Sequence, residues 1–171
     1  MVSLHRSLLV ATAVIALAGC SKKPPKDLPP APVDSARPDS SADTGTSAGP
    51  VKGSQADFVS SVLSDHIYFT TDKYDIDTQS QSTLRSQAQW MMANPNVHVT
   101  VEGHCDERGT RDYNLALGER RANAAKNYLA SLGIDPARIS TISYGKERPA
   151  ALGSDETAWA QNRRAVTVVV D

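Results

Sequence analysis

The sequence predicts an α/β sandwich in which helices pack on one four-stranded sheet, in the order β-α-β-α-β-(α)-β. Short runs of β-prone residues alternate with longer stretches whose apolar residues recur at helical spacing. The pattern occupies roughly 105–115 residues, which is enough for one hydrophobic core. It contains no internal repeat, so a repeat architecture is not expected.

The first predicted elements lie before residue 97. Phe58–Leu63 indicates a short helical turn, and Ile67–Phe69 is a short β-prone run that predicts a strand. Asp77 or Thr78 can cap the helix that follows, because a side-chain oxygen at this position accepts from a free backbone N–H. The Asn-Pro-Asn sequence at 94–96 ends that helix.

A second strand and a long helix come next. Residues 97–102 alternate valine with a polar residue, which is typical of a half-buried strand, and Gly103 is expected to end it. The helix is predicted from about Asp112 to Ser131, with Gly133 as its C-cap. Its core stripe has 4-3-4-3 spacing and consists of Gly118, Ala122, Ala125, Leu129 and Leu132.

The last three elements complete the sheet. Arg138–Tyr144 predicts a third strand, and Glu156–Asn162 predicts a short helix. Arg164–Val170 ends in Val-Thr-Val-Val-Val and predicts the fourth strand. Helices that cover one face of such a sheet leave the loops at the strand ends free to carry a site.

The chain begins with the pattern of a secretory signal peptide, with Arg6 before the apolar run Leu8–Leu17. The run is too short to span a membrane. It leads into Leu-Ala-Gly-Cys20, which resembles a bacterial lipobox. That resemblance implies cleavage before Cys20 and acylation of it, and Ser21 after it favours the outer membrane. The alternative is an ordinary signal peptide in which Cys20 is an incidental thiol.

The next segment, Ser21–Asp57, holds seven of the ten prolines and few large aliphatic residues. Such a composition cannot bury enough apolar surface to offset the entropy of ordering, so we expect a disordered tether. The predicted organisation is a signal peptide at 1–19, the acylated Cys and tether at 20–57, and a domain at 58–171. Without residues 1–19 the chain keeps 17 basic and 19 acidic residues, and this balance gives no reason to expect nucleic acid as a partner.

Two residues suggest a site for a small zwitterion. Asp106 follows the second predicted strand, and Arg121 lies fifteen residues later beside the apolar stripe of the long helix. A carboxylate can bind an ammonium group, and a guanidinium can bind a carboxylate through two parallel hydrogen bonds. The alternatives are that Asp106 caps its own turn and that Arg121 is solvated.

Several separated blocks carry a more specific signal. They are the run Val101–Ala122, which includes Gly-His-Cys-Asp106, and the sequences His66–Phe69, Asp72–Ile76, Ser143–Pro149 and Asn162–Ala165. Together they resemble the OmpA-like peptidoglycan-binding domain family over roughly residues 66–170. The resemblance implies that Asp106 receives the α-ammonium of diaminopimelate in the peptidoglycan stem peptide. It also implies that Arg121 pairs with the diaminopimelate carboxylate.

Further contacts are expected around this pair. Thr110 and Asn114, near the helix start, can donate hydrogen bonds, and Leu117 lies on the side of Arg121 and can offer apolar contact. A second group is expected from matching loops of the family: Asp72, Tyr74, Arg163 and Arg164. For Asp72 and Tyr74 the alternative is a hairpin-like loop with a packed tyrosine. Thr70-Thr71 stands where related sequences carry an acidic and an aromatic residue.

Cys105 stands between His104 and Asp106, which raises the question of catalysis or a metal. Strand alternation would put His104 and Asp106 on one side and Cys105 on the other. No Cys-x-x-Cys or His-x-x-x-His spacing supports a metal site. We therefore expect a buried apolar thiol, no metal, no cofactor and no enzymatic activity.

The predicted function is non-enzymatic adhesion, in which a lipid anchor in the outer membrane is joined by a tether to a periplasmic domain that binds peptidoglycan. The resemblance further implies the periplasmic β-propeller protein of the Tol system as a partner, possible contacts with other Tol or outer-membrane proteins, and roles in outer-membrane integrity and invagination during cell division. Two alternatives are an enzyme of wall turnover that uses residues 104–106, and the domain of a motor stator or porin. A motor stator or a porin would carry a membrane helix or a barrel before the domain.

Overall fold

The computed structural model describes residues 49–170. The predicted signal peptide, Cys20 and most of the predicted tether lie outside the described residues. Within residues 49–170, no helix combines the length and apolar character that crossing a membrane requires.

The sheet has four strands, namely β1 (His66–Tyr68), β2 (His98–His104), β3 (Ile139–Gly145) and β4 (Arg164–Val170). Their order across the sheet is β1-β4-β2-β3. Strand β4 pairs antiparallel with both β1 and β2, while β2 and β3 are parallel. The predicted fold class is confirmed, because a parallel pair joined by a helix and an antiparallel last strand form one mixed sheet.

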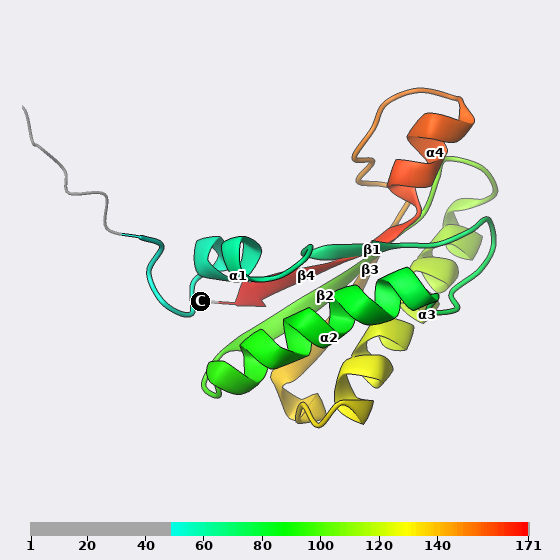
Figure 1. The fold of residues 1–171 in the computed structure, drawn as a ribbon. Coiled ribbons are helices and arrows are strands. Elements are labelled where there is room, and N and C mark those ends of the chain that lie inside the picture. The colour runs from blue at the N-terminus through cyan, green and yellow to red at the C-terminus, as the bar shows by residue number, and fades with distance from the viewer. Residues whose placement is uncertain (1–48, 171) are drawn as a thin grey trace, which may run out of the picture. The chain divides into compact units, whose positions relative to one another are not determined.

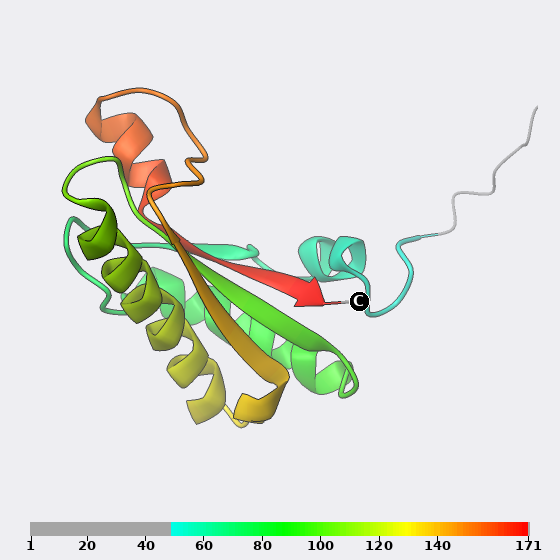
Figure 2. The same ribbon diagram turned by 180° about the vertical axis from the view of Figure 1, so that it is seen from behind.

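Two long helices, α2 (Thr78–Ala93) and α3 (Arg111–Ser131), cover the sheet. Figure 1 views the sheet from the side of α2, and Figure 2 shows the strands in front of that helix. Val99 and Val101 of β2 are buried, as the alternation predicts, and they join one apolar cluster with Leu84, Met91, Ala122, Ala125 and Leu129. Burial of this cluster is the main source of stability for a domain of this size.

The first helix, α1 (Gln55–Ser61), begins three residues before the predicted turn and inside the segment assigned to the tether. Its buried Phe58 packs edge-on against Trp90, with the ring centroids 4.9 Å apart. The side chain of Gln55 accepts a hydrogen bond of 2.7 Å from the backbone N–H of Val169. The ordered domain therefore includes residues that composition alone assigned to the tether.

Gly103 does not end the second strand, as the sequence suggested, because β2 continues to His104. A Cβ atom at Gly103 would lie 1.8 Å from the carbonyl oxygen of Gly118. The glycine thus permits the backbones of β2 and α3 to approach closely. This contact places the N-terminal half of α3 directly against the end of β2.

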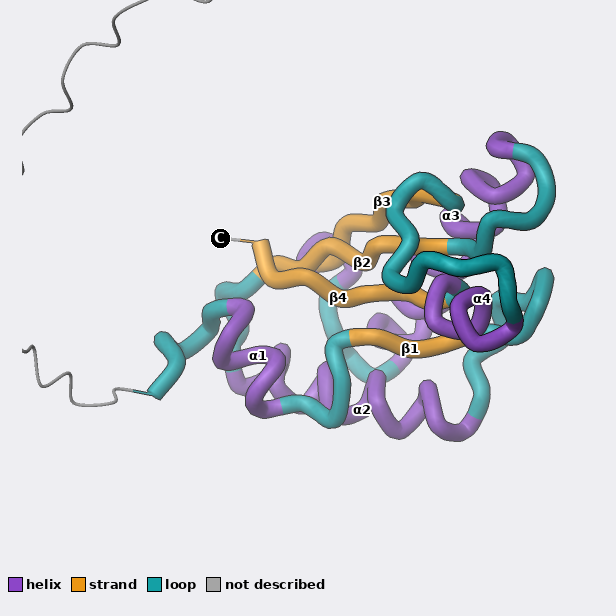
Figure 3. Tube along the Cα trace, turned by 90° about the horizontal axis from the view of Figure 1, so that it is seen from above, coloured by secondary structure: helices purple, strands orange, loops and turns teal. Residues whose placement is uncertain are grey.

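The remaining boundaries agree closely with expectation. Asp77 caps α2 by accepting from the N–H of Ser80, and α3 begins at Arg111, one residue before the prediction. A 3-10 turn at Pro136–Arg138 precedes β3, which starts one residue late. The short helix α4 (Glu156–Asn162) and β4 have the predicted bounds. Figure 3 shows α4 and the long loop before it near the end of the sheet opposite α1.

Candidate ligand-binding site

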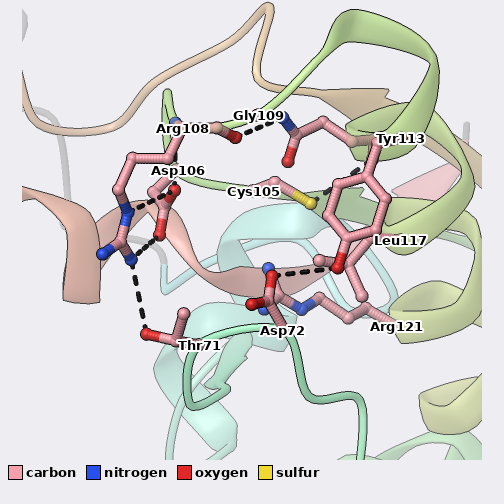
Figure 4. A pocket seen from close by; sticks show the side chains of 10 residues that line it. Thr71, Asp72, Cys105, Asp106, Arg108, Gly109, Tyr113, Leu117 and Arg121 are labelled. Atoms are coloured by element: carbon pink, nitrogen blue, oxygen red, sulfur yellow. Dashed lines mark hydrogen bonds and ion pairs between the residues drawn. The ribbon is translucent and has the colours of Figure 1, made fainter.

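A cavity of about 300 Å³ opens where the loop after β1, the loop after β2 and the first turns of α3 meet. Figure 4 shows Asp106 and Arg108 on one side of this cavity and Arg121 with Asp72 on the other. Five of the nine residues predicted to bind ligand lie in its wall, so the structure brings this part of the predicted site together. The complete lining consists of Thr71, Asp72, Cys105, Asp106, Arg108, Gly109, Tyr113, Asn114, Leu117 and Arg121.

Arg121 lies on the inner face of α3 and is completely buried. Its guanidinium donates from Nε to the carbonyl of Lys73 at 2.9 Å, from Nη1 to that of His104 at 2.8 Å and from Nη2 to that of Thr70 at 3.1 Å. A guanidinium has five N–H donors. Each terminal nitrogen carries two N–H groups and donates to one of these carbonyls, and Arg121 belongs to the lining of the cavity.

Arg121 also makes no ion pair with any carboxylate of residues 49–170. Burial lowers the pKa of Arg121, although the group stays charged because a guanidinium remains protonated throughout the pH range in which proteins function. A buried cation is unfavourable unless an anion pairs with it. The deep end of the cavity is therefore suited to bind an anion.

Asp106 lies in the loop that follows β2 and is almost fully buried. Its carboxylate accepts from the backbone N–H of Arg108 at 3.1 Å, from Nε of the same residue at 3.1 Å and from its Nη2 at 2.5 Å. Nη1 of Arg163 adds a bond of 3.3 Å. Burial acts to raise the pKa of Asp106, but the hydrogen bonds from Arg108 outweigh it and hold the pKa below its usual value. Asp106 is consequently ionised at neutral pH.

Tyr113 belongs to the cavity wall and was missed from the sequence. Its hydroxyl donates to Oδ1 of Asp72 at 2.9 Å, and this bond raises the pKa of Tyr113. Asp72 has a φ of +56°, in the left-handed region that aspartate tolerates better than most residues. The signal available was the spacing of Tyr113 and Leu117, which at i and i+4 lie on one side of the helix.

Asn114 holds the loop between β2 and α3. Its side-chain amide donates to the carbonyls of Arg108 at 2.7 Å and Thr110 at 3.0 Å. The backbone carbonyl of Asn114 accepts a bond of 3.4 Å from the thiol of Cys105. With these bonds made, Asn114 shapes the cavity rather than presenting a free amide donor to it.

The expectation that Cys105 faces away from Asp106 is wrong, because both line the same cavity. Strand alternation stops at His104, where β2 ends, and the chain direction changes in the loop. Burial raises the pKa of the Cys105 thiol to about 11, so it stays protonated at neutral pH. The His104 ring lies instead beside Tyr144, and burial lowers its pKa to about 4.

Four predicted site residues do not line the cavity. Thr110 caps α3 by accepting from the N–H of Tyr113, and Tyr74 is exposed outside the cavity. Arg163 is buried behind Asp106, where it also donates to the carbonyl of Phe69 at 3.0 Å. Arg164 donates to the carbonyl of Arg148 at 3.3 Å. Direct contact of these four residues with a ligand stays a prediction. Of the four, only Arg163 binds Asp106.

Residues 68–163 match the sequence model of the OmpA family. The chain belongs to the OmpA family. Within it, the chain is 48% identical over 163 residues to the peptidoglycan-associated lipoprotein of Agrobacterium fabrum, which covers 95% of this chain and 86% of the relative. It is 42% identical to the peptidoglycan-associated lipoprotein of Haemophilus influenzae, over 94% of this chain and 95% of that one. The predicted family is thereby confirmed.

Solved structures give the same result. The peptidoglycan-associated lipoprotein of Burkholderia pseudomallei has 45% sequence identity and a TM-score of 0.61, and the match covers 62% of this chain and 90% of that one. The C-terminal domain of Helicobacter pylori MotB has 21% identity and a TM-score of 0.57, over 63% of this chain and 84% of that one. At that identity the second match shows the shared fold alone.

Proposed function

We propose that the domain binds peptidoglycan without forming a covalent bond, by recognising the diaminopimelate residue of the stem peptide. The α-ammonium group binds the carboxylate of Asp106, and the neighbouring carboxylate binds Arg121. Such a ligand carries the two charges that the cavity complements. The names of the relatives, which are peptidoglycan-associated lipoproteins, support the same ligand class.

The observation that carries this proposal is that Arg121 is buried without a carboxylate partner among residues 49–170. The residue is buried and charged, and its three hydrogen bonds to carbonyls fix the plane of the guanidinium. A guanidinium can bind a carboxylate through two parallel hydrogen bonds, and each terminal nitrogen of Arg121 has a second N–H beyond the one bonded to a carbonyl. Because the group is already ordered and desolvated, binding requires little further loss of entropy from the protein.

The other lining residues have supporting roles. Leu117 offers apolar contact to the methylene chain of diaminopimelate. The hydroxyl of Tyr113 orients Asp72 at the cavity wall, where a carboxylate can attract a second ammonium group. Thr110, Tyr74 and Arg164 then contribute only if the peptide or glycan extends beyond the cavity.

The cellular role is part of the same proposal and draws on the family and the N-terminal sequence. Acylated Cys20 anchors the chain in the outer membrane, and the tether allows the periplasmic domain to reach the cell wall. The chain acts in the Tol–Pal system with the periplasmic β-propeller protein of that system, in outer-membrane integrity and in inward folding of that membrane at division. A role as an enzyme of wall turnover is disfavoured, because the thiol of Cys105 is protonated and hydrogen-bonded to a backbone carbonyl.

Co-sedimentation with isolated peptidoglycan tests the binding claim. The chain from Ser21 onward should pellet with the cell wall, and Asp106→Asn should abolish pelleting, since it removes the charge while keeping the size of the side chain. Asp112→Asn is the matched control, because Asp112 is exposed in the first turn of α3 outside the cavity. Equal pelleting of wild type and Asp106→Asn would refute the site, and muropeptide release by the wild type would refute the non-enzymatic role.

A further inference from the structure

The carboxylate that is proposed to receive the ligand ammonium is already occupied by Arg108. Two guanidinium nitrogens of Arg108 bind the two carboxylate oxygens of Asp106, Nε to Oδ1 at 3.1 Å and Nη2 to Oδ2 at 2.5 Å. This is the bidentate geometry that makes an arginine–carboxylate pair strong. A ligand ammonium and Arg108 therefore compete for the same two oxygens.

Two neighbours hold Arg108 in this position. Its Nη2 also donates to Oγ1 of Thr71 at 3.3 Å, across the cavity wall. Its guanidinium lies over the Trp159 ring of α4, 4.2 Å from the ring centroid, where a cation is attracted to the aromatic face. The indole N–H of Trp159 donates in turn to Glu107 at 3.1 Å. Figure 4 shows Arg108 reaching from Asp106 to Thr71 at the cavity.

Arg108 differs from the other arginine bound to Asp106 in its freedom to move. The side chain of Arg163 is 7% exposed and bonded to three different residues. The side chain of Arg108 is 39% exposed. Arg108 can rotate into solvent while Arg163 stays and keeps the carboxylate in place.

We propose that Arg108 is an internal competitor of the ligand ammonium, which occupies Asp106 in the empty site and must be displaced before a zwitterion binds. The proposal rests on the proposed function, because it assumes that Asp106 receives an ammonium group. It assigns Arg108 a role in specificity. A simple amine gains only Asp106 and must displace Arg108, whereas a zwitterion also gains the guanidinium of Arg121.

The test is calorimetric titration of meso-diaminopimelate into the chain from Ser21 onward. Arg108→Met keeps an unbranched side chain against Trp159 but removes the competing charge, and we expect its affinity to rise about fivefold, the upper range for a partly exposed ion pair. Arg108→Lys keeps a cation but loses the bidentate pair, so its affinity should lie between those of the wild type and Arg108→Met. Arg111→Met is the matched control, because Arg111 forms an exposed ion pair with Glu147 outside the cavity; its affinity should not change.

Pimelate, which has the same carbon chain and no amino group, separates competition from a general effect on the cavity. Its affinity should not rise in Arg108→Met, because it does not need Asp106. An equal rise for both compounds would overturn the proposal. So would an unchanged or weaker affinity of Arg108→Met for meso-diaminopimelate, which would make Arg108 a bystander or a ligand contact and leave the proposed function intact. Failure of the wild type to bind meso-diaminopimelate would instead overturn the proposed function and this inference with it.

Discussion

Arg121→Met should greatly destabilise the domain, because Arg121 joins three segments of the chain through the carbonyls of Thr70, Lys73 and His104. Each buried carbonyl that loses its donor costs about 1–3 kcal/mol. Removing the buried charge recovers part of this free energy, because burying methionine does not require taking a charge out of water. The net loss in the free energy of unfolding should be about 3–5 kcal/mol, a large part of the ~5–15 kcal/mol of a typical domain.

Urea unfolding followed by circular dichroism measures this loss, and thermal unfolding should show a Tm lower by roughly 12–20 °C, at about 4 °C per kcal/mol. Arg120→Met is the control, because Arg120 is exposed on the same turn of α3, and it should change the free energy of unfolding by less than about 0.5 kcal/mol. A loss below 1 kcal/mol in Arg121→Met would refute the claim that this residue fastens the loop after β1 to β2.

Four further measurements have defined outcomes. Gly103→Ala should prevent α3 from docking on β2, so the variant should lose its cooperative unfolding transition, while Gly49→Ala, where a Cβ meets nothing, should be neutral. The thiol of Cys105, with its pKa raised to about 11, should react with a thiol reagent at pH 8 only after unfolding; rapid reaction of the folded domain would contradict its burial. The pKa of His104 is lowered to about 4 from an ordinary value of 6.5. As the pH drops, His104 is therefore protonated in the unfolded state before it is protonated in the folded state. The free energy of unfolding should consequently fall between about pH 6.5 and pH 4. His104→Phe should show a smaller fall between urea midpoints at pH 7 and pH 5, and a fall equal to that of the wild type would exclude His104 as its source. Cys20→Ser should abolish acyl labelling and retention in the outer membrane; unchanged fractionation would contradict the predicted anchor.

The sequence predicted the elements well, because local signals determine them. The alternation of valines in β2, the caps Asp77 and Gly133, and the spacing of small residues along α3 all act over a few residues. Gly103 was misjudged because its role depends on Gly118, fifteen residues later, and not on its own neighbours. The start of α1 was missed because Gln55 is held by β4, at the far end of the chain.

The site was predicted in part for the same reason. Asp106 and Arg121 follow from the order of strand, loop and helix together with the family resemblance, and the structure places both in one cavity. Arg108 and Tyr113 were missed because their partners, Thr71, Asp72 and Trp159, come from distant segments. Strand alternation also failed at Cys105, since the rule applies only as far as the strand continues.

The structure of the domain with bound meso-diaminopimelate tests the central claim most directly. The account predicts one carboxylate of the ligand on Nη1 and Nη2 of Arg121, and the adjacent ammonium on Asp106. Arg108 should have left Asp106 while Arg163 keeps its bond. A ligand bound on another surface, or a carboxylate placed away from Arg121, would contradict the account.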